Sequence, residues 1–161
     1  MNKAFLTLLT TFLLFCSCQS TDNNAVLEKN KAVVLEYHKV WSGAKIDNLD
    51  EILTPDFVCH YLTSEEWKGI DSAKKNISDW LAIFPDWKEE IVDIIQENDK
   101  VVTRYKATAS HTNTYEGIDS TGVKIEIYEV SIYRISNGKI AEQWAFPDDP
   151  AIKKQILNFK K

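Results

Sequence analysis

The apolar positions of the chain change their spacing near its middle, from a helical period to an alternating one. From residue 25 to about residue 43, apolar side chains recur every three or four positions, as on one face of an amphipathic helix. The same reasoning predicts a short helix over residues 47–53 and a longer one from residue 69 or 70 to Phe84, with a short strand over residues 56–62 between them. The first half is therefore predicted to be mainly helical.

The second half of the chain alternates apolar and polar side chains with a period of two. Four strands are predicted, over residues 87–96, 100–115, 123–135 and 139–146. Asn137 and Gly138 tolerate the positive φ of a tight hairpin turn, so we expect the last two strands to be antiparallel neighbours. A final helix is predicted over residues 151–158.

This order of elements predicts an α+β fold. Helices followed by an antiparallel meander give a curved sheet covered by the N-terminal helices, which together form a cone. With 161 residues, the chain is long enough for one domain with a real core. We assign that domain to residues 25–161.

The N-terminus predicts export. Residues 1–18 have the lysine, the short apolar run and the ending of a signal peptide, and the residues before Cys18 resemble a bacterial lipobox. Cys18 is then the lipidation site, and residues 19–24 form a tether. The protein is expected in the cell envelope, attached to a membrane only through this lipid. Two alternatives stay open, namely an ordinary cleaved signal peptide and a buried N-terminal helix.

The charge pattern argues against a nucleic-acid partner. The net charge is −5, and lysines and arginines are interspersed among acidic residues. The sequence contains no group of cysteines, histidines and carboxylates at the spacing of metal ligands. It also contains no phosphate-binding glycine loop and no nucleophile motif. We therefore expect no metal and no cofactor.

Several short motifs together resemble a known family. They are Phe57, His60, Gly69, Pro85-Asp86, Asn98 to Val102, His111-Thr112, Glu116 to Ile118, Ser120 to Gly122, Gly138 to Ile140, Glu142 to Trp144, and Asp148. In this order they resemble the SnoaL-like polyketide cyclase (ester cyclase) family of the nuclear-transport-factor-2-like superfamily, over residues 25–159. The resemblance implies a cone with a metal-free pocket, in which an Asp and a His perform acid/base chemistry on a carbon acid.

His111 and Asp148 are the catalytic candidates. His111 shares a strand face with Tyr105, and an imidazole titrates near neutral pH, with an ordinary pKa of about 6.5. Asp148 follows Trp144 by four positions, as in the family. Each has a structural alternative: His111 as a surface residue at a strand end, and Asp148 as the cap of the last helix.

Four further residues are predicted to line the pocket: His60, Tyr105, Glu142 and Trp144. A simple two-residue turn at Asn137-Gly138 would place Glu142 and Trp144 on one sheet face with Glu129 and Tyr133. That face is either an acid/base site or a solvated outer surface. His38, on the first helix, is interpreted as structural or exposed.

Three functional hypotheses follow. The first is a cofactor-free cyclase, isomerase or dehydratase that acts on a small hydrophobic carbonyl compound. The second is a non-catalytic ligand-binding lipoprotein that uses the same cavity, and the third is a dimeric interaction module that self-associates through its sheet surface. Catalysis requires an acid and a base that both face the cavity.

Overall fold

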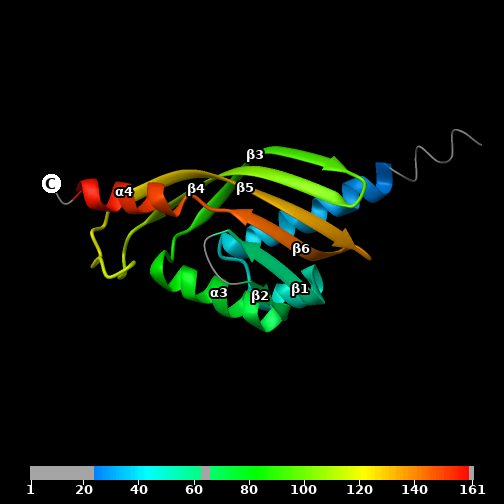
Figure 1. Ribbon diagram of the computed structural model, residues 1–161, viewed down its shortest axis with the longest axis horizontal. Helices are drawn as coiled ribbons and strands as arrows, with labels where there is room; N and C mark the ends of the chain where they lie inside the picture. The colour runs from blue at the N-terminus through cyan, green and yellow to red at the C-terminus, as the bar shows by residue number, and fades with distance from the viewer. Residues whose placement is uncertain (1–23, 63–65, 160–161) are drawn as a thin grey trace, which may run out of the picture.

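A curved six-stranded sheet with helices on its concave side forms the protein. The computed structural model describes residues 24–62 and 66–159. Figure 1 shows the sheet with its strands in the order β2-β1-β6-β5-β4-β3. The predicted signal peptide, Cys18 and residues 19–23 lie outside the described residues and stay predictions, whereas Asn24, the last residue of the predicted tether, is already helical.

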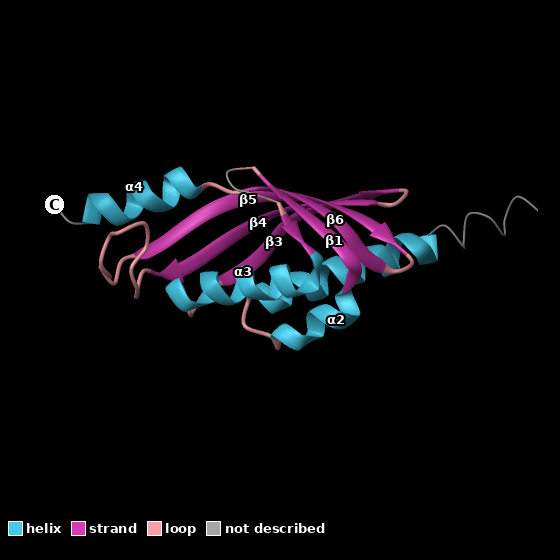
Figure 2. Cartoon of the chain, turned by 60° about the horizontal axis from the view of Figure 1, so that its bottom comes forward, coloured by secondary structure: helices cyan, strands magenta, loops and turns pink. Residues whose placement is uncertain are grey.

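Two long helices occupy the concave side of the sheet. The helices are the N-terminal helix (residues 24–41), η1 (Ile46–Asn48), α2 (Leu49–Ile52), α3 (Gly69–Ile83) and α4 (Asp149–Phe159). Figure 2 shows the strands arching over α3, with α4 beyond one end of the sheet. The predicted first and third helices are confirmed. In the part of the chain that the structure describes, no helix combines the length and the apolar character needed to cross a bilayer.

The sheet is mixed rather than purely antiparallel. Its strands are β1 (Leu53–Tyr61), β2 (Trp67–Lys68), β3 (Lys88–Glu97), β4 (Lys100–Ser110), β5 (Lys124–Ser136) and β6 (Lys139–Phe146). The predicted meander from β3 to β6 is confirmed, but β1 pairs with β6 in parallel. Alternation along one strand does not reveal the direction of its partner, which is why this pairing was not predicted. The α+β class itself is confirmed.

The strand predicted over residues 100–115 ends early, at Ser110. Beyond it, the backbone N–H of His111 donates to the Val123 carbonyl, and a two-residue turn joins Tyr115 to Ile118. Glu116 and Gly117 form that turn with φ of 46° and 75°. Positive φ at two consecutive residues reverses the chain sharply. The chain therefore turns back beyond Ser110, where the sequence pattern had predicted that the strand would continue.

A β-bulge sets the register of the β5–β6 hairpin. Asn137 and Gly138 adopt the expected positive φ, but the register shifts between Arg134 and Ile135. Ile135 pairs with Ile140 and Arg134 pairs with Glu142, so Ala141 is the extra residue. An extra residue in one strand turns every following side chain to the other face.

The shifted register changes which β6 side chains face inward. Tyr133 pairs with Gln143, and Ser131 pairs with Ala145. The prediction that Glu142 and Trp144 share a face with Glu129 and Tyr133 is therefore wrong.

The hydrophobic core lies between the sheet and the two long helices, in two clusters. One contains Val34 and Tyr37 of the N-terminal helix with Ile77 of α3. The other contains Ile152 and Ile156 of α4 with the far end of β4 and β5. The partly buried Trp41 and Leu81 pack against both clusters. Residues of both clusters border a cavity on the concave side.

Candidate active site

A cavity of about 680 Å³ occupies the concave side of the sheet. Its walls come from the N-terminal helix, α3, the inner faces of the strands, and the start of α4. Eight aromatic residues line it: Trp41, Tyr61, Trp67, Trp80, Trp87, Tyr105, Tyr115 and Tyr133. The volume falls in the range of small-molecule sites, and such sites combine an apolar lining with a few convergent polar groups.

Glu129 is the most unusual polar group in this cavity. Its side chain points inward from β5 and is 8% exposed. The Tyr105 hydroxyl donates to Oε2 at 2.8 Å, and the backbone N–H of Asp148 donates to Oε1 at 3.1 Å. Tyr105 is the direct cross-strand partner of Glu129. The carboxyl group is thus held in one orientation by two donors.

Burial raises the pKa of Glu129 to about 7. The two hydrogen bonds lower this pKa, because they favour the charged form, whereas the negative charges of Glu89 and Asp149 raise it. A carboxyl group with a pKa near neutrality is populated in both protonation states at physiological pH. It can therefore accept a proton and give it back.

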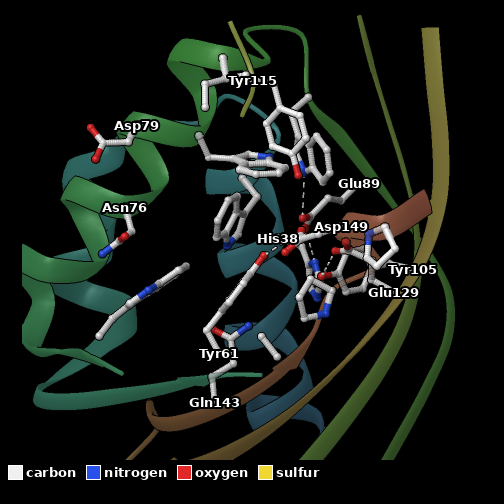
Figure 3. Close-up of a pocket in the computed structure, with 18 of the residues that line it drawn as sticks. His38, Tyr61, Asn76, Asp79, Glu89, Tyr105, Tyr115, Glu129, Gln143 and Asp149 are labelled. Carbon is white, nitrogen blue, oxygen red and sulfur yellow. Dashed lines mark hydrogen bonds and ion pairs between the residues drawn. The ribbon is translucent and has the colours of Figure 1, made fainter. Parts of the chain in front are cut away.

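His38 and Glu89 form a buried pair beside Tyr105. Nδ1 of His38 lies 2.5 Å from Oε2 of Glu89, and their side chains are 6% and 3% exposed. The Trp87 indole N–H donates to the other carboxylate oxygen at 3.0 Å. The His38 and Tyr105 rings meet edge to face at 4.8 Å. Figure 3 shows His38, Glu89 and Tyr105 on one side of the cavity together with Glu129.

The partners of His38 define its tautomer. A carboxylate can only accept, so the ring proton lies on Nδ1 and the lone pair of neutral His38 lies on Nε2. The hydroxyl groups of Thr103 and Tyr133 both lie 3.1 Å from Nε2. Burial raises the pKa of Tyr133, so its hydroxyl stays protonated. A chain of polar groups therefore runs from Glu89 through His38 to Tyr133 in the cavity wall.

A further hydrogen-bonded row supports the cavity floor. The Tyr37 hydroxyl donates to Oε1 of Gln143 at 3.0 Å, and the Gln143 amide donates to the Ser131 hydroxyl at 3.2 Å. Gln143 lines the cavity and is 4% exposed. Such satisfied buried groups hold their side chains in fixed positions.

His111 lies outside the cavity lining. It continues the inward face of β4, as predicted, and is fully buried. Its Nδ1 lies 3.0 Å from the Thr121 hydroxyl, and its ring contacts Phe84 and Tyr115. The structure thus places it in the packed end of the cone. Its predicted role in proton transfer stays a prediction, and we do not include His111 in the candidate site.

Asp148 caps the last helix, which is the structural alternative to a catalytic role. Its side chain is exposed, and Oδ1 accepts from the backbone N–H of Ala151 at 3.2 Å in the first turn of α4. The link of Asp148 to the cavity is its backbone N–H, which donates to Glu129. The neighbouring Asp149 lines the cavity and accepts from the Tyr61 hydroxyl at 3.3 Å.

Of the four predicted pocket residues, Tyr105 lines the cavity. The other three, His60, Glu142 and Trp144, lie together on the convex face of the sheet. His60 stacks on Trp144 at 5.3 Å, and its Nε2 lies 2.9 Å from Oε1 of Glu142. Arg134 donates to the other Glu142 oxygen at 2.8 Å. The interactions with Glu142 and Glu66 raise the pKa of His60. The bulge at Ala141 is the reason that Glu142 and Trp144 face outward.

Sequence reasoning missed His38 and Glu89, although a signal existed for each. His38 lies four residues after Val34 and three before Trp41, which puts it on the buried stripe of the N-terminal helix. Glu89 lies two residues after the buried Trp87, on the same side of the chain. Only the tertiary structure pairs them. Among the described residues, no group of three or more His, Cys, Asp and Glu side chains could hold a metal ion.

Comparison with known proteins agrees with the fold. The profile of the SnoaL-like polyketide cyclase family matches residues 31–156. No curated protein matches the sequence.

Solved structures with the same fold include three of bacterial origin. A candidate SnoaL-like polyketide cyclase from Jannaschia sp. CCS1 has 22% identity and a TM-score of 0.74, over 80% of this chain and 92% of that one. AclR, a candidate hydroxylase from Streptomyces galilaeus, has 25% identity and a TM-score of 0.73, over 82% and 83%. IdmH, a candidate polyketide cyclase from Streptomyces antibioticus, has 22% identity and a TM-score of 0.72, over 79% and 97%.

Proposed function

Since the chain belongs to the SnoaL-like polyketide cyclase family, we propose that it binds a small hydrophobic carbonyl compound in the cavity and catalyses cofactor-free acid/base chemistry there. The reaction class is proton abstraction from a carbon next to a carbonyl group, followed by ring closure, isomerisation or dehydration. Fold alone does not determine the reaction, so the proposal depends on the residues of the site.

One observation carries the proposal: a buried carboxyl group with a pKa of about 7 faces an aromatic cavity. Glu129 has the environment that suits a general acid/base, because its protonated and ionised forms are close in free energy at neutral pH. Its orientation is fixed by the Tyr105 hydroxyl and by the Asp148 N–H.

In the proposed mechanism, ionised Glu129 removes the proton from the carbon beside the carbonyl group. The electrons of that C–H bond move into the carbonyl group, which becomes an enolate. The enolate carbon then attacks a second carbonyl carbon, or it is reprotonated elsewhere along the conjugated system. Glu129 gives its proton to the new alkoxide or to the carbon, and this step regenerates the starting carboxylate.

Tyr133 is proposed to stabilise the enolate oxygen. Tyr133 lines the cavity, and its hydroxyl stays protonated because burial raises its pKa. The Tyr133 and Thr103 hydroxyls both lie 3.1 Å from Nε2 of His38, so in this proposal Thr103 donates to that nitrogen and the Tyr133 proton is available to the enolate oxygen. Glu89 fixes the His38 ring through Nδ1. A hydroxyl donor held in the cavity wall stabilises the negative charge that develops on the enolate oxygen.

Hydrogen–deuterium exchange at carbon tests this proposal without knowledge of the natural substrate. The purified full-length protein is incubated in D₂O with 1-tetralone, a bicyclic aromatic ketone, and deuterium next to the carbonyl group is followed by NMR. We expect exchange above the buffer rate, and Glu129→Gln should lower the protein-dependent rate by about a hundredfold or more.

The control is Glu142→Gln, which changes a glutamate on the convex face of the sheet. It should leave the exchange rate unchanged. If 1-tetralone binds and no variant alters its exchange, the cavity is a carrier or sensor site rather than an active site. Equal losses in both variants would contradict the assignment of Glu129.

A further inference from the structure

The charged residues of the cavity are strongly biased toward acids. Its lining contains five carboxylates: Asp79, Glu89, Glu116, Glu129 and Asp149. Lys153 is the single lysine or arginine in that lining, and its Nζ lies 2.7 Å from the Glu116 carboxylate. A carboxylate or phosphate on a ligand would therefore meet repulsion from several acids and a cation that is already engaged.

Glu129 adds a buried negative charge when it ionises. In the described part of the chain, its hydrogen-bond partners are the neutral Tyr105 hydroxyl and the neutral Asp148 N–H. The neighbouring charges of Glu89 and Asp149 act against its ionisation. The interior of the cavity is thus short of positive charge at the place where Glu129 faces it.

Aromatic rings line the same cavity as these acids. Tyr61 stacks on Trp67 at 5.3 Å, and Trp67 contacts Trp41 at 6.4 Å. Around a second part of the lining, Trp80 meets Trp87 and Tyr115 edge to face at 5.2 and 6.0 Å. The faces of tyrosine and tryptophan rings attract cations, and the attraction is strongest where water is excluded. Rings combined with nearby carboxylates are the chemistry by which proteins recognise ammonium groups.

We propose that the cavity takes a ligand with a protonated amine or quaternary ammonium group on a planar hydrophobic body, and that the ammonium group lies between Glu129, Asp149 and the rings of Tyr61 and Tyr115. This inference rests on the proposed function, because it assumes that the cavity is the ligand site. It narrows the carbonyl compounds considered above to those that carry a cationic nitrogen.

Binding of such a cation is coupled to the protonation of Glu129. The groups that face this carboxyl group come from every element around it: Tyr61 on β1, Glu89 on β3, Tyr105 on β4, Tyr115 in the loop after β4, Asp149 on α4, and His38 on the N-terminal helix beside Tyr105. A bound cation favours the ionised form of Glu129 and so releases its proton. Affinity for the cation should therefore rise as the pH increases through about 7 and then level off.

Three probes of nearly equal shape test the charge preference. They are trimethyl(2-naphthylmethyl)ammonium, its uncharged carbon isostere 2-neopentylnaphthalene, and the anion 2-naphthylacetate. Because none of them titrates near neutrality, any pH dependence comes from the protein. Binding to the full-length protein is measured by calorimetry from about pH 6 to about pH 8, in two buffers that differ in ionisation enthalpy. We expect the ammonium probe to bind about tenfold or more tightly than the isostere at the higher pH.

Two variants separate the role of Glu129 from general surface charge. Glu129→Gln should weaken binding of the ammonium probe and abolish both its pH dependence and the proton release. Glu126→Gln removes the same charge from an exposed position on the same strand, and it should leave both unchanged. Equal effects of the two substitutions would overturn the proposed ammonium position.

The outcomes also distinguish this inference from the proposed function. If the uncharged isostere or the anion binds as tightly as the ammonium probe, the charge preference is wrong. If 1-tetralone is exchanged in a Glu129-dependent manner and the ammonium probe does not bind, the inference fails and the proposed function stands. If no probe of any charge binds and 1-tetralone is not exchanged either, both fail.

Discussion

The hydroxyl group of Tyr105 lies 2.8 Å from Oε2 of Glu129, and the two residues are direct partners on neighbouring strands. This contact fixes the direction of the carboxyl group that faces the cavity. It also opposes the effect of burial, since the hydrogen bond lowers the pKa of Glu129 while desolvation raises it to about 7. The protonation state of the site is therefore set by a balance that single substitutions can shift.

Tyr105→Phe should move the titration of Glu129 to higher pH. The substitution keeps the ring and removes the hydrogen bond that favours the carboxylate. A hydrogen bond to a charged group is worth about 1.5 kcal/mol or more, which corresponds to a pKa rise of about one unit. The pH profile of 1-tetralone exchange and the carbon NMR shift of the Glu129 carboxyl group measure this rise. An unchanged profile would mean that the hydroxyl does not support the charged form.

The stability of the protein should fall as Glu129 ionises. Its pKa rises from 4.5 to about 7 on folding, so the folded state holds a proton that the unfolded state has lost. The favourable contribution is complete below about pH 4.5 and is lost as the pH rises through about 7, with a total of about 3 kcal/mol.

Urea unfolding at a series of pH values tests this stability prediction. Glu129→Gln cannot ionise and should not show that part of the decline. The gap between the free energies of unfolding should therefore widen in favour of the variant from about pH 4.5 to about pH 7 and stay constant above it. A constant gap between those pH values would contradict a raised pKa at this position.

His38→Leu should destabilise the fold by about 3 kcal/mol, because it leaves the buried Glu89 carboxylate without its imidazole partner. The matched change on the convex face is His60→Leu. His60 is also paired with glutamates, but its side chain is 31% exposed, and its loss should cost about 1 kcal/mol or less. The free energies of unfolding in urea check both values. Similar losses would contradict a special role for the buried pair.

Cys18 is predicted to carry lipid, although it lies outside the described residues. Growth with a labelled fatty acid should mark the protein, and the protein should sediment with membranes. Cys18→Ser should remove both properties, while Cys16→Ser should leave them intact, because Cys16 departs with the signal peptide. Membrane association that persists in Cys18→Ser would indicate an anchor of another kind.

Much of the architecture could be predicted from local patterns. The 3.6-residue period of the N-terminal helix and of α3, and the Asn137-Gly138 turn, are consequences of near neighbours in the sequence. The parallel pairing of β1 with β6 was not predicted, because it depends on the tertiary arrangement. The candidate site was predicted only in part for the same reason. Tyr105, a predicted pocket residue, lines the cavity, whereas His38 and Glu89 meet across 51 residues of chain.

The outward position of Glu142 and Trp144 depends on a single backbone irregularity, the β-bulge in β6. Without the extra residue Ala141, Glu142 would lie opposite Tyr133 on the same sheet face, which is the register predicted from the sequence. Strand alternation predicts the faces of each strand correctly but cannot detect an insertion of one residue between them.

The parallel pairing of β1 with β6 also sets the order in which the cone can be assembled. The meander from β3 to β6 consists of adjacent hairpins, whereas β1 must wait for a strand made about 80 residues later, as the 82-residue separation of His60 and Glu142 illustrates. Pairings between distant segments form slowly, since the loop between them must first be closed. We therefore expect the meander to fold first and β1 to dock last. The wall that carries Tyr61 and Trp67 is then the last part to close and the first to detach.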